Sequence, residues 1–193
     1  MQNVYIILYE KFTALDAFGP VEVFGNVSDY ELHYVSLHGG TVTSRQSLPI
    51  ETEPMENVEP GGIILIPGGP GSRTMVNEND FLMAFRKLAD EAEYVLSVCT
   101  GAAIVAKTGV LDGRLATSNK RAFDWVVSCG EKVNWVREAR WVADGKFYTS
   151  AGVSAGIDMT LGFVKDRYDE ERADEICRQM EYHWHKDAAK DLF

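Results

Sequence analysis

Cysteine is scarce in this sequence of 193 residues, and its distribution excludes two common structural roles. The three cysteines, Cys99, Cys129 and Cys177, lie far apart and form no Cys-x-x-Cys motif. They therefore predict neither a disulfide framework nor a zinc site. Because free thiols persist in reducing compartments, the cysteine usage favours a cytoplasmic protein.

Histidine is also scarce, with four residues in the chain. His183 and His185 flank Trp184, but no third ligand follows at a spacing typical of a metal site. We therefore predict no metal centre, and no motif in the chain implies an organic cofactor.

Basic charge and long apolar runs are lacking as well. Lys and Arg total 19 against 29 Asp and Glu, so the formal net charge is −10. This balance argues against nucleic acid or an anionic membrane as a partner. No apolar run approaches the length of a membrane span, and the first residues lack the basic lead and apolar region of a secretory signal. We again expect a cytoplasmic location.

Apolar strands that alternate with helices are what the chain does contain. Its hydrophobic residues, 46% of the total, suffice for the core of one domain over residues 1–193. The predicted strands are Val4–Tyr9, Leu32–Leu37, Ile63–Ile66, Tyr94–Val98 and Leu115–Thr117, with hairpins at Thr41–Ile50 and Ala139–Thr149. The predicted helices are Ala17–Phe24, interrupted or kinked near Gly19-Pro20, Phe81–Ala92, Ile104–Thr108, Arg121–Ser128, Ser154–Lys165 and Glu170–Glu181. This order predicts a doubly wound, flavodoxin-like α/β fold with a mostly parallel sheet flanked by helices.

The most informative stretch is the junction between the strand Tyr94–Val98 and the helix that begins near Ile104. A single reactive side chain, Cys99, stands there, and the small residues Thr100–Ala103 follow it. Hydrolases present their nucleophile at such an elbow, and a helix N-terminus favours the thiolate. We therefore predict that Cys99 is a nucleophile ionised at neutral pH. The alternative is a buried structural cysteine.

Two further loops should lie beside this elbow, because sites in parallel sheets form beyond the carboxyl ends of the strands. Pro67–Gly71 follows the strand Ile63–Ile66, and its glycines leave backbone amides exposed. The amides of Gly69 and Thr100 are candidate donors to a developing negative charge. The alternative is a plain turn, and the pattern of a phosphate-binding loop is absent.

The loop after the first strand supplies two carboxylates. Asp16 or Glu22 could provide the general acid or base that a lone thiol lacks. The alternative for Asp16 is a capping box with Thr13, and the alternative for Glu22 is an exposed helix face.

These motifs resemble the ThiJ/PfpI superfamily, also called the class I glutamine amidotransferase-like fold, and the resemblance covers nearly the whole chain. It rests on Leu15–Phe24, Ile66–Gly69, Ser97–Ala102, Gly109–Thr117 and Ser150–Met159. The Leu-Asp and Cys-Thr-Gly elements look like the isocyanide hydratase branch and the ligand-sensing domains of AraC-type regulators. The resemblance implies Cys99 as nucleophile, Asp16 as its acid/base partner, Gly69 and Thr100 as oxyanion donors, Gly152 and Val153 as a pocket wall, and a homodimer.

Two departures from the superfamily's patterns matter. Protease-like members carry a histidine directly after the cysteine, where this chain has Thr100. Hydratase-like members usually have a His-Trp pair where this chain has Asn119-Lys120. No motif therefore places a histidine near the elbow, which disfavours a peptidase or amidotransferase-like activity. AraC-type regulators add a DNA-binding domain that is not in this sequence.

Two functional hypotheses follow. In the first, the Cys99 thiolate attacks an electrophilic carbon of a small molecule, such as an isocyanide or a carbonyl, and Asp16 carries the proton. The chain is then a hydratase or lyase. In the second, Cys99 oxidises reversibly and the chain is a redox or ligand sensor.

Overall fold

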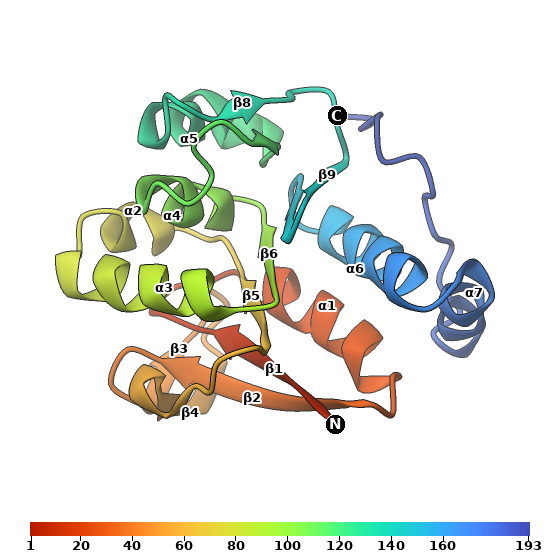
Figure 1. Ribbon diagram of the computed structural model, residues 1–193, viewed down its shortest axis with the longest axis horizontal. Helices are drawn as coiled ribbons and strands as arrows, with labels where there is room; N and C mark the ends of the chain where they lie inside the picture. The colour runs from red at the N-terminus through yellow and green to blue at the C-terminus, as the bar shows by residue number, and fades with distance from the viewer.

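An eight-stranded sheet forms the centre of the protein, which a computed structural model describes over all 193 residues (Figure 1). The strand order is β3-β4-β2-β1-β5-β6-β10-β9, and the pairings from β4 to β10 are parallel. Only the two edge strands run antiparallel to their neighbours. The strands are β1 (Gln2–Ile7), β2 (Tyr30–Ser36), β3 (Gly40–Thr43), β4 (Pro49–Pro54), β5 (Ile63–Ile66), β6 (Tyr94–Val98), β9 (Trp141–Asp144) and β10 (Phe147–Ser150).

Helices cover both faces of this sheet (Figure 1). Helices α1 (Ala14–Gly25), α6 (Ala155–Arg167) and α7 (Glu170–Gln179) pack together on one side. Helices α2 (Ser72–Met75), α3 (Asn79–Glu91), α4 (Gly101–Lys107) and α5 (Phe123–Cys129) lie on the other. With both faces covered, the central strand β5 is apolar along its whole length, and all four of its residues are buried. The predicted fold class, a mostly parallel α/β sheet flanked by helices, is confirmed.

Several predicted details differ from the structure. Helix α1 continues through Pro20 from Ala14 to Gly25, so the predicted interruption is absent. Thr13 makes no side-chain capping bond, which removes the capping-box interpretation of Asp16. The predicted strand near Leu115 is β7 (Leu115–Ala116), which pairs outside the main sheet with β8 (Asn134–Trp135). The two predicted hairpins are present, and both extend the main sheet at its edges.

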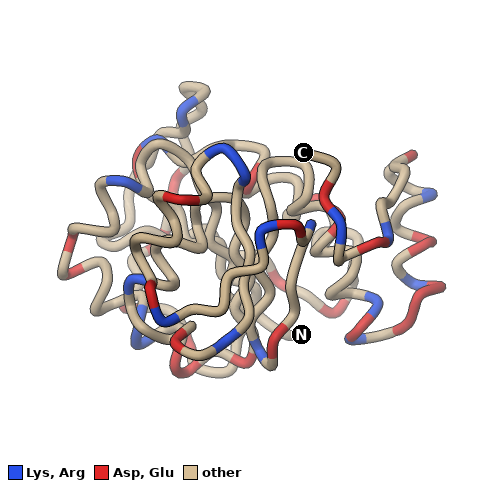
Figure 2. Tube along the Cα trace, turned by 90° about the horizontal axis from the view of Figure 1, so that it is seen from above, with Lys and Arg blue, Asp and Glu red and all other residues tan.

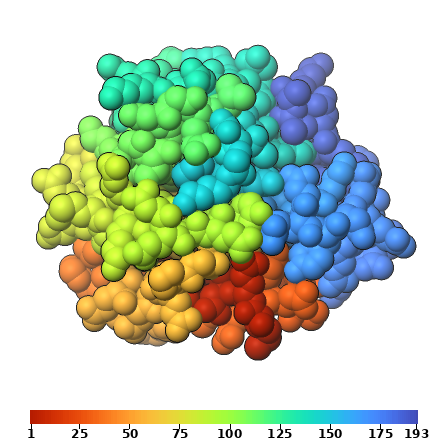
Figure 3. Space-filling model, viewed as in Figure 1, coloured from red at the N-terminus to blue at the C-terminus, as the bar shows by residue number.

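The segment after α7 has little regular structure but is firmly attached. Residues 182–193 run from the end of α7 past α6 to a position beside the loop between β8 and β9 (Figures 1 and 3). Asp158, fully buried in α6, accepts hydrogen bonds from the Tyr182 hydroxyl and the His185 amide. Arg140 bridges Asp158 to Asp191. A buried charge network therefore holds this segment against the domain.

Charged residues of both signs are mixed along the chain, including over α7 (Figure 2). Lys186, for example, pairs with Glu170 and Asp174. None of the helices combines the length and apolar character that crossing a membrane requires.

Candidate active site

Cys99 occupies a strained turn between β6 and α4. Its φ is +57°, a left-handed conformation that costs a non-glycine residue about 1–3 kcal/mol and is concentrated at functional sites. Hydrogen bonds from the surrounding structure to the Cys99 backbone offset this cost. The Cys99 amide lies 3.2 Å from the Ser150 carbonyl and 3.3 Å from that of Ala151, and the Ser118 hydroxyl donates to the Cys99 carbonyl at 2.7 Å. The elbow predicted from the sequence is therefore present.

Two glycines allow the loop after β5 to lie directly against this elbow. A Cβ on Gly101 would lie 2.6 Å from the Ile66 carbonyl oxygen. A Cβ on Gly68 would lie 2.5 Å from the Thr100 nitrogen and 2.9 Å from the Cys99 Cβ. Neither position has room for a side chain, so both glycines are needed for the close approach of the two loops.

Asp16 faces the elbow from the first turn of α1 and is fully buried. The Gly68 amide donates to its Oδ2 at 3.1 Å. Its Oδ1 has no other hydrogen-bond partner, and the thiol of Cys99 adjoins the carboxyl group. The structure thus brings together the predicted nucleophile and the predicted acid/base residue.

Burial determines the protonation of this pair. It raises the pKa of Asp16 from 3.8 to about 7, although the hydrogen bonds from the thiol and from Gly68 oppose the shift. Burial also raises the pKa of Cys99 to about 12, with a further contribution from the negative charge of Asp16. The amide and hydroxyl of Thr100 lower it only in part. The predicted resting thiolate is therefore contradicted: Cys99 is only 7% exposed, and desolvation outweighs the stabilisation of the thiolate by the Thr100 amide and hydroxyl.

A second network fixes the residue after the nucleophile. The Gly69 amide donates to the Thr100 hydroxyl oxygen at 2.9 Å. The buried Ser72 hydroxyl lies 3.0 Å from the same oxygen and 2.8 Å from the Gly69 carbonyl. The Gly69 amide is consequently not free to bind a developing negative charge in this arrangement, whereas the Thr100 amide faces the Cys99 sulfur.

Gly152 and Val153, the predicted pocket wall, line a pocket of about 210 Å³ near the elbow. Gly152 follows Ala151, whose carbonyl accepts from the Cys99 amide. Asn119, another lining residue, follows Ser118, which donates to the Cys99 carbonyl. The complete lining is Asn119, Lys120, Arg121, Gly152, Val153, Asp191 and Phe193.

Glu22 lies away from this site. Its side chain is exposed on α1, as the alternative interpretation of this residue required, and it makes no contact with Cys99.

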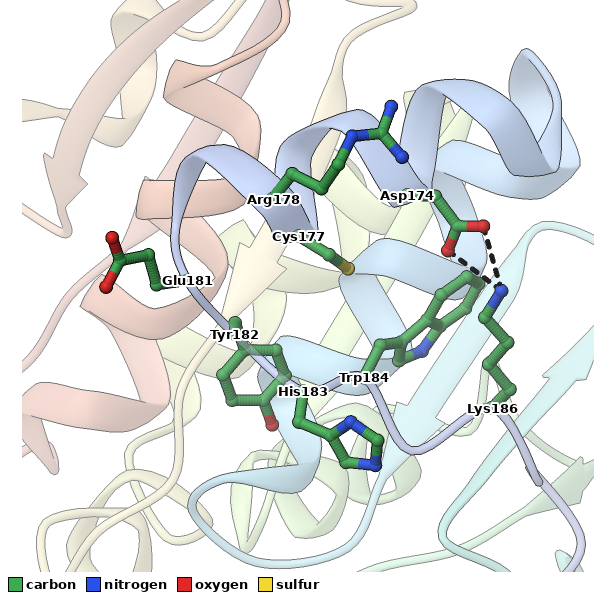
Figure 4. Close-up of a pocket in the computed structure, with 8 residues that line it drawn as sticks. All are labelled: Asp174, Cys177, Arg178, Glu181, Tyr182, His183, Trp184 and Lys186. Atoms are coloured by element: carbon green, nitrogen blue, oxygen red, sulfur yellow. Dashed lines mark hydrogen bonds and ion pairs between the residues drawn. The ribbon is translucent and has the colours of Figure 1, made fainter.

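The two histidines near Trp184 also lie apart from the site. His183 lines a separate pocket beside Cys177, Trp184 and Lys186 (Figure 4). The ring of His185 instead contacts the Lys190 carbonyl. The structure contains no group of three His, Cys, Asp or Glu side chains arranged to hold a metal ion.

Three residues near the elbow escaped the sequence analysis. Tyr9 donates to the Pro67 carbonyl at 2.7 Å. Burial raises the pKa of Tyr9, and the nearby Asp16 and Cys99 raise it further. Ser72 and Ser118 contact the elbow as described above. The only available signal for Tyr9 was its position at the carboxyl end of the first strand, and isolated serines have no distinctive pattern.

The fold and the site together define a class: an α/β protein with a cysteine at a nucleophile elbow and a buried carboxyl beside it. The family model for the DJ-1/PfpI family matches residues 2–166. The chain belongs to the DJ-1/PfpI family.

Relatives with known names extend this assignment. Isonitrile hydratase of Pseudomonas putida is 30% identical over 93% of this chain and 78% of its own length. A deglycase of Pyrococcus horikoshii is 31% identical over 63% of this chain and 73% of its own. A ThiJ/PfpI family protein from Pseudomonas syringae superposes with a TM-score of 0.87 at 28% identity, covering 94% of this chain and 75% of that one.

Proposed function

We propose that this protein hydrates a small isocyanide to the corresponding N-substituted formamide, with Cys99 as nucleophile and Asp16 as proton carrier. The observation that carries the proposal is the fully buried Asp16 carboxyl group beside the buried Cys99 thiol, where burial raises the pKa of Asp16 to about 7. A carboxyl group with a pKa of about 7 is ionised often enough to accept a proton and is acidic enough to return it.

In the first step, the Asp16 carboxylate takes the thiol proton as the Cys99 sulfur bonds to the terminal carbon of the isocyanide. The proton on Asp16 then passes to that carbon, which yields a thioimidate, R–N=CH–S–Cys99. The carboxylate is thereby regenerated. This step adds the sulfur and the proton of the thiol to the same carbon atom, and it needs no oxidant or reductant.

In the second step, water adds to the thioimidate carbon with Asp16 as general base. The nitrogen takes the electron pair, and Asp16 passes to it the proton taken from the water. Asp16 then takes the proton of the new hydroxyl group as the carbonyl forms and the carbon–sulfur bond breaks. Asp16 returns its proton to the sulfur. The products are R–NH–CHO and the resting thiol, so the sum of both steps is the addition of one water molecule to the isocyanide.

The similarity to isonitrile hydratase supports this substrate class, because it extends over 93% of the chain. The similarity to deglycases makes a carbonyl compound the second candidate, since the same thiol can add to an aldehyde carbon. The sensor alternative is less well supported. A thiol that keeps its proton at neutral pH reacts slowly with peroxide, because the thiolate is the reactive form.

The proposal also includes a homodimeric, cytoplasmic protein in which residues 1–193 form one domain. Three free thiols favour the cytoplasm. Light scattering coupled to size exclusion tests the dimer, and a monomer at micromolar concentration would contradict it.

The decisive experiment measures turnover of para-nitrophenyl isocyanide, and separately of methylglyoxal, by the wild-type protein and three variants. Cys99→Ala and Asp16→Asn should abolish hydration. Cys129→Ser, which changes a cysteine remote from the elbow, should retain wild-type turnover. Turnover of methylglyoxal alone would favour the carbonyl substrate. The proposed chemistry would be refuted if Cys99→Ala retained both activities. It would also be refuted if the wild-type protein turned over neither substrate and instead formed a sulfinate rapidly.

A further inference from the structure

The backbone amide of Thr100 is the elbow donor that remains free. A donor beside Cys99 matters because attack at a carbon held by sulfur moves negative charge onto a neighbouring atom. The Gly69 amide already donates to the Thr100 hydroxyl, whereas the Thr100 amide donates to no oxygen in the structure. Burial and the charge of Asp16 raise the pKa of the Cys99 thiol, and the Thr100 amide acts against them by lowering it. The direction of this amide therefore determines how well the elbow stabilises negative charge.

The carbonyl group of Cys99 fixes that direction. The carbonyl of Cys99 and the amide of Thr100 belong to one planar peptide unit, in which the C=O and the N–H point in opposite directions. No backbone amide donates to the Cys99 carbonyl. Its partner is the hydroxyl of Ser118, a fully buried residue, which donates to the carbonyl oxygen at 2.7 Å. A hydrogen bond at one end of the peptide unit thus sets the direction of the donor at the other end, and it also polarises that donor.

This hydrogen bond matters because the elbow is strained. Cys99 has a φ of +57°, and strain of this kind persists only where the surrounding structure holds the backbone. The carbonyls of Ser150 and Ala151 hold the amide side of Cys99. On its carbonyl side, the holding contact comes from Ser118. Without that contact the peptide unit can rotate, which relieves the strain and turns the Thr100 amide away from the sulfur.

Ser118 is itself held from two directions. The amide of Thr117, its neighbour in the chain, donates to the Thr149 hydroxyl oxygen at 2.8 Å. Thr149 lies in β10, which pairs with β6, the strand that leads into the elbow. From the other direction, the ammonium group of Lys120 donates to the Ser118 carbonyl at 3.3 Å and lies 3.6 Å from the carboxylate of Asp191. The main sheet and the C-terminal segment together fix the position of the Ser118 hydroxyl.

We propose that Ser118 is a positioning residue of the elbow, whose hydroxyl holds the peptide unit Cys99–Thr100 so that the Thr100 amide points at the sulfur and at the atom that gains negative charge during attack. Lys120, which pairs with the segment 182–193, holds Ser118 in turn. The C-terminal segment therefore contributes to the geometry of a site that it does not enter. The inference rests on the proposed function and deepens it. Ser118 acts through the backbone and not on the substrate.

Two variants weaken this arrangement at different points. Ser118→Ala removes the hydroxyl and leaves a side chain of nearly the same size. Lys120→Met removes the ammonium group that holds Ser118, while Asp191 keeps Arg140 as its partner. Thr108→Val is the matched control, because the buried Thr108 hydroxyl also donates to a backbone carbonyl at 2.7 Å, at the opposite end of α4. Circular dichroism and urea unfolding establish that each variant is folded.

Alkylation of Cys99 by iodoacetamide, followed by mass spectrometry of the peptide that contains it, tests the inference without a substrate. The thiolate is the reactive form, and a misdirected Thr100 amide makes it scarcer. The higher nucleophilicity of the remaining thiolate offsets only part of this loss. We expect the rate constant to fall by about three- to tenfold in Ser118→Ala and by about threefold in Lys120→Met, with no change in Thr108→Val.

The sign of the change separates positioning from a merely structural role. A variant that only loosened the packing would react faster than the wild type, because the buried thiol would become exposed. A rate constant in folded Ser118→Ala equal to or above that of the wild type would overturn the inference. If Ser118→Ala does not fold, Lys120→Met decides by the same criterion.

Turnover of the isocyanide is the second measurement. Ser118→Ala should lower kcat by about 10- to 100-fold with a smaller change in KM, because the Thr100 amide stabilises charge that appears only during attack. Wild-type kcat in folded Ser118→Ala would overturn the inference. Slower alkylation of Ser118→Ala, together with no isocyanide turnover by the wild type, would retain the role of Ser118 and reject the substrate.

Discussion

Replacing Asp16 by Asn should stabilise the protein while it abolishes activity, and the stabilisation should grow with pH. The Asp16 side chain is fully buried, and its pKa is raised from 3.8 to about 7. A carboxyl group with a raised pKa opposes folding wherever it would be ionised in the unfolded chain. The contribution of the protonated Asp16 to the free energy of unfolding is fully present below about pH 4 and is lost as the pH rises through 7.

The magnitude follows from the size of the shift, at 1.36 kcal/mol for each pH unit. The penalty is about 1.7 kcal/mol at pH 5 and about 4 kcal/mol at pH 8. Asn is neutral and close in shape, and its side-chain oxygen can still accept the Gly68 amide. The gain in the free energy of unfolding should therefore be larger at pH 8 than at pH 5 by about 2–3 kcal/mol.

Urea-induced unfolding at these two pH values, followed by circular dichroism, measures the effect. Glu22→Gln is the control, because it makes the same chemical change at an exposed position of the same helix. A stability gain of equal size at both pH values would refute the assignment of a raised pKa to Asp16. A loss of stability at pH 8 would show that the carboxylate is stabilised by its surroundings.

Three further predictions follow from the same geometry. For the wild-type protein, kcat/KM for the isocyanide should rise tenfold per pH unit below about pH 7 and level off above it, since Asp16 must be ionised to accept the thiol proton. A pH–rate profile that levels off at about pH 4 would contradict this. Gly101→Ala should lower the free energy of unfolding by about 1–3 kcal/mol and reduce turnover, because the new methyl group would lie 2.6 Å from the Ile66 carbonyl oxygen. Urea unfolding and turnover that both match the wild type would contradict this prediction. Arg140→Met should cost about 3–5 kcal/mol in the same unfolding assay and release residues 182–193 to limited proteolysis, because it leaves the buried Asp158 carboxylate without a cation and removes one of the two cations that pair with Asp191. A change below about 1 kcal/mol with an uncut segment would contradict it.

Much of the fold could be predicted because its determinants are local. The run Ile63–Ile66 is apolar at every position, which is typical of a strand buried on both faces. The Asp-Gly turn of the β9–β10 hairpin has a recognisable sequence, and Gly145 has the expected positive φ of +62°. The short helix α2 was not predicted, since one turn of helix carries too few residues to show a period.

The amino-acid sequence alone determined the alternation of strands and helices, the elbow and the glycines around it, because each depends on the conformational preferences of neighbouring residues. Only the tertiary structure decided the chemistry of the site. The thiol keeps its proton because β6, α1 and the loop after β5 together remove water from the sulfur, an effect that no local pattern encodes. The same packing engages the Gly69 amide and, through Ser118, the Cys99 carbonyl. Contacts between residues far apart in the chain thus set both protonation and donor geometry, since desolvation and hydrogen bonding depend on distance in space.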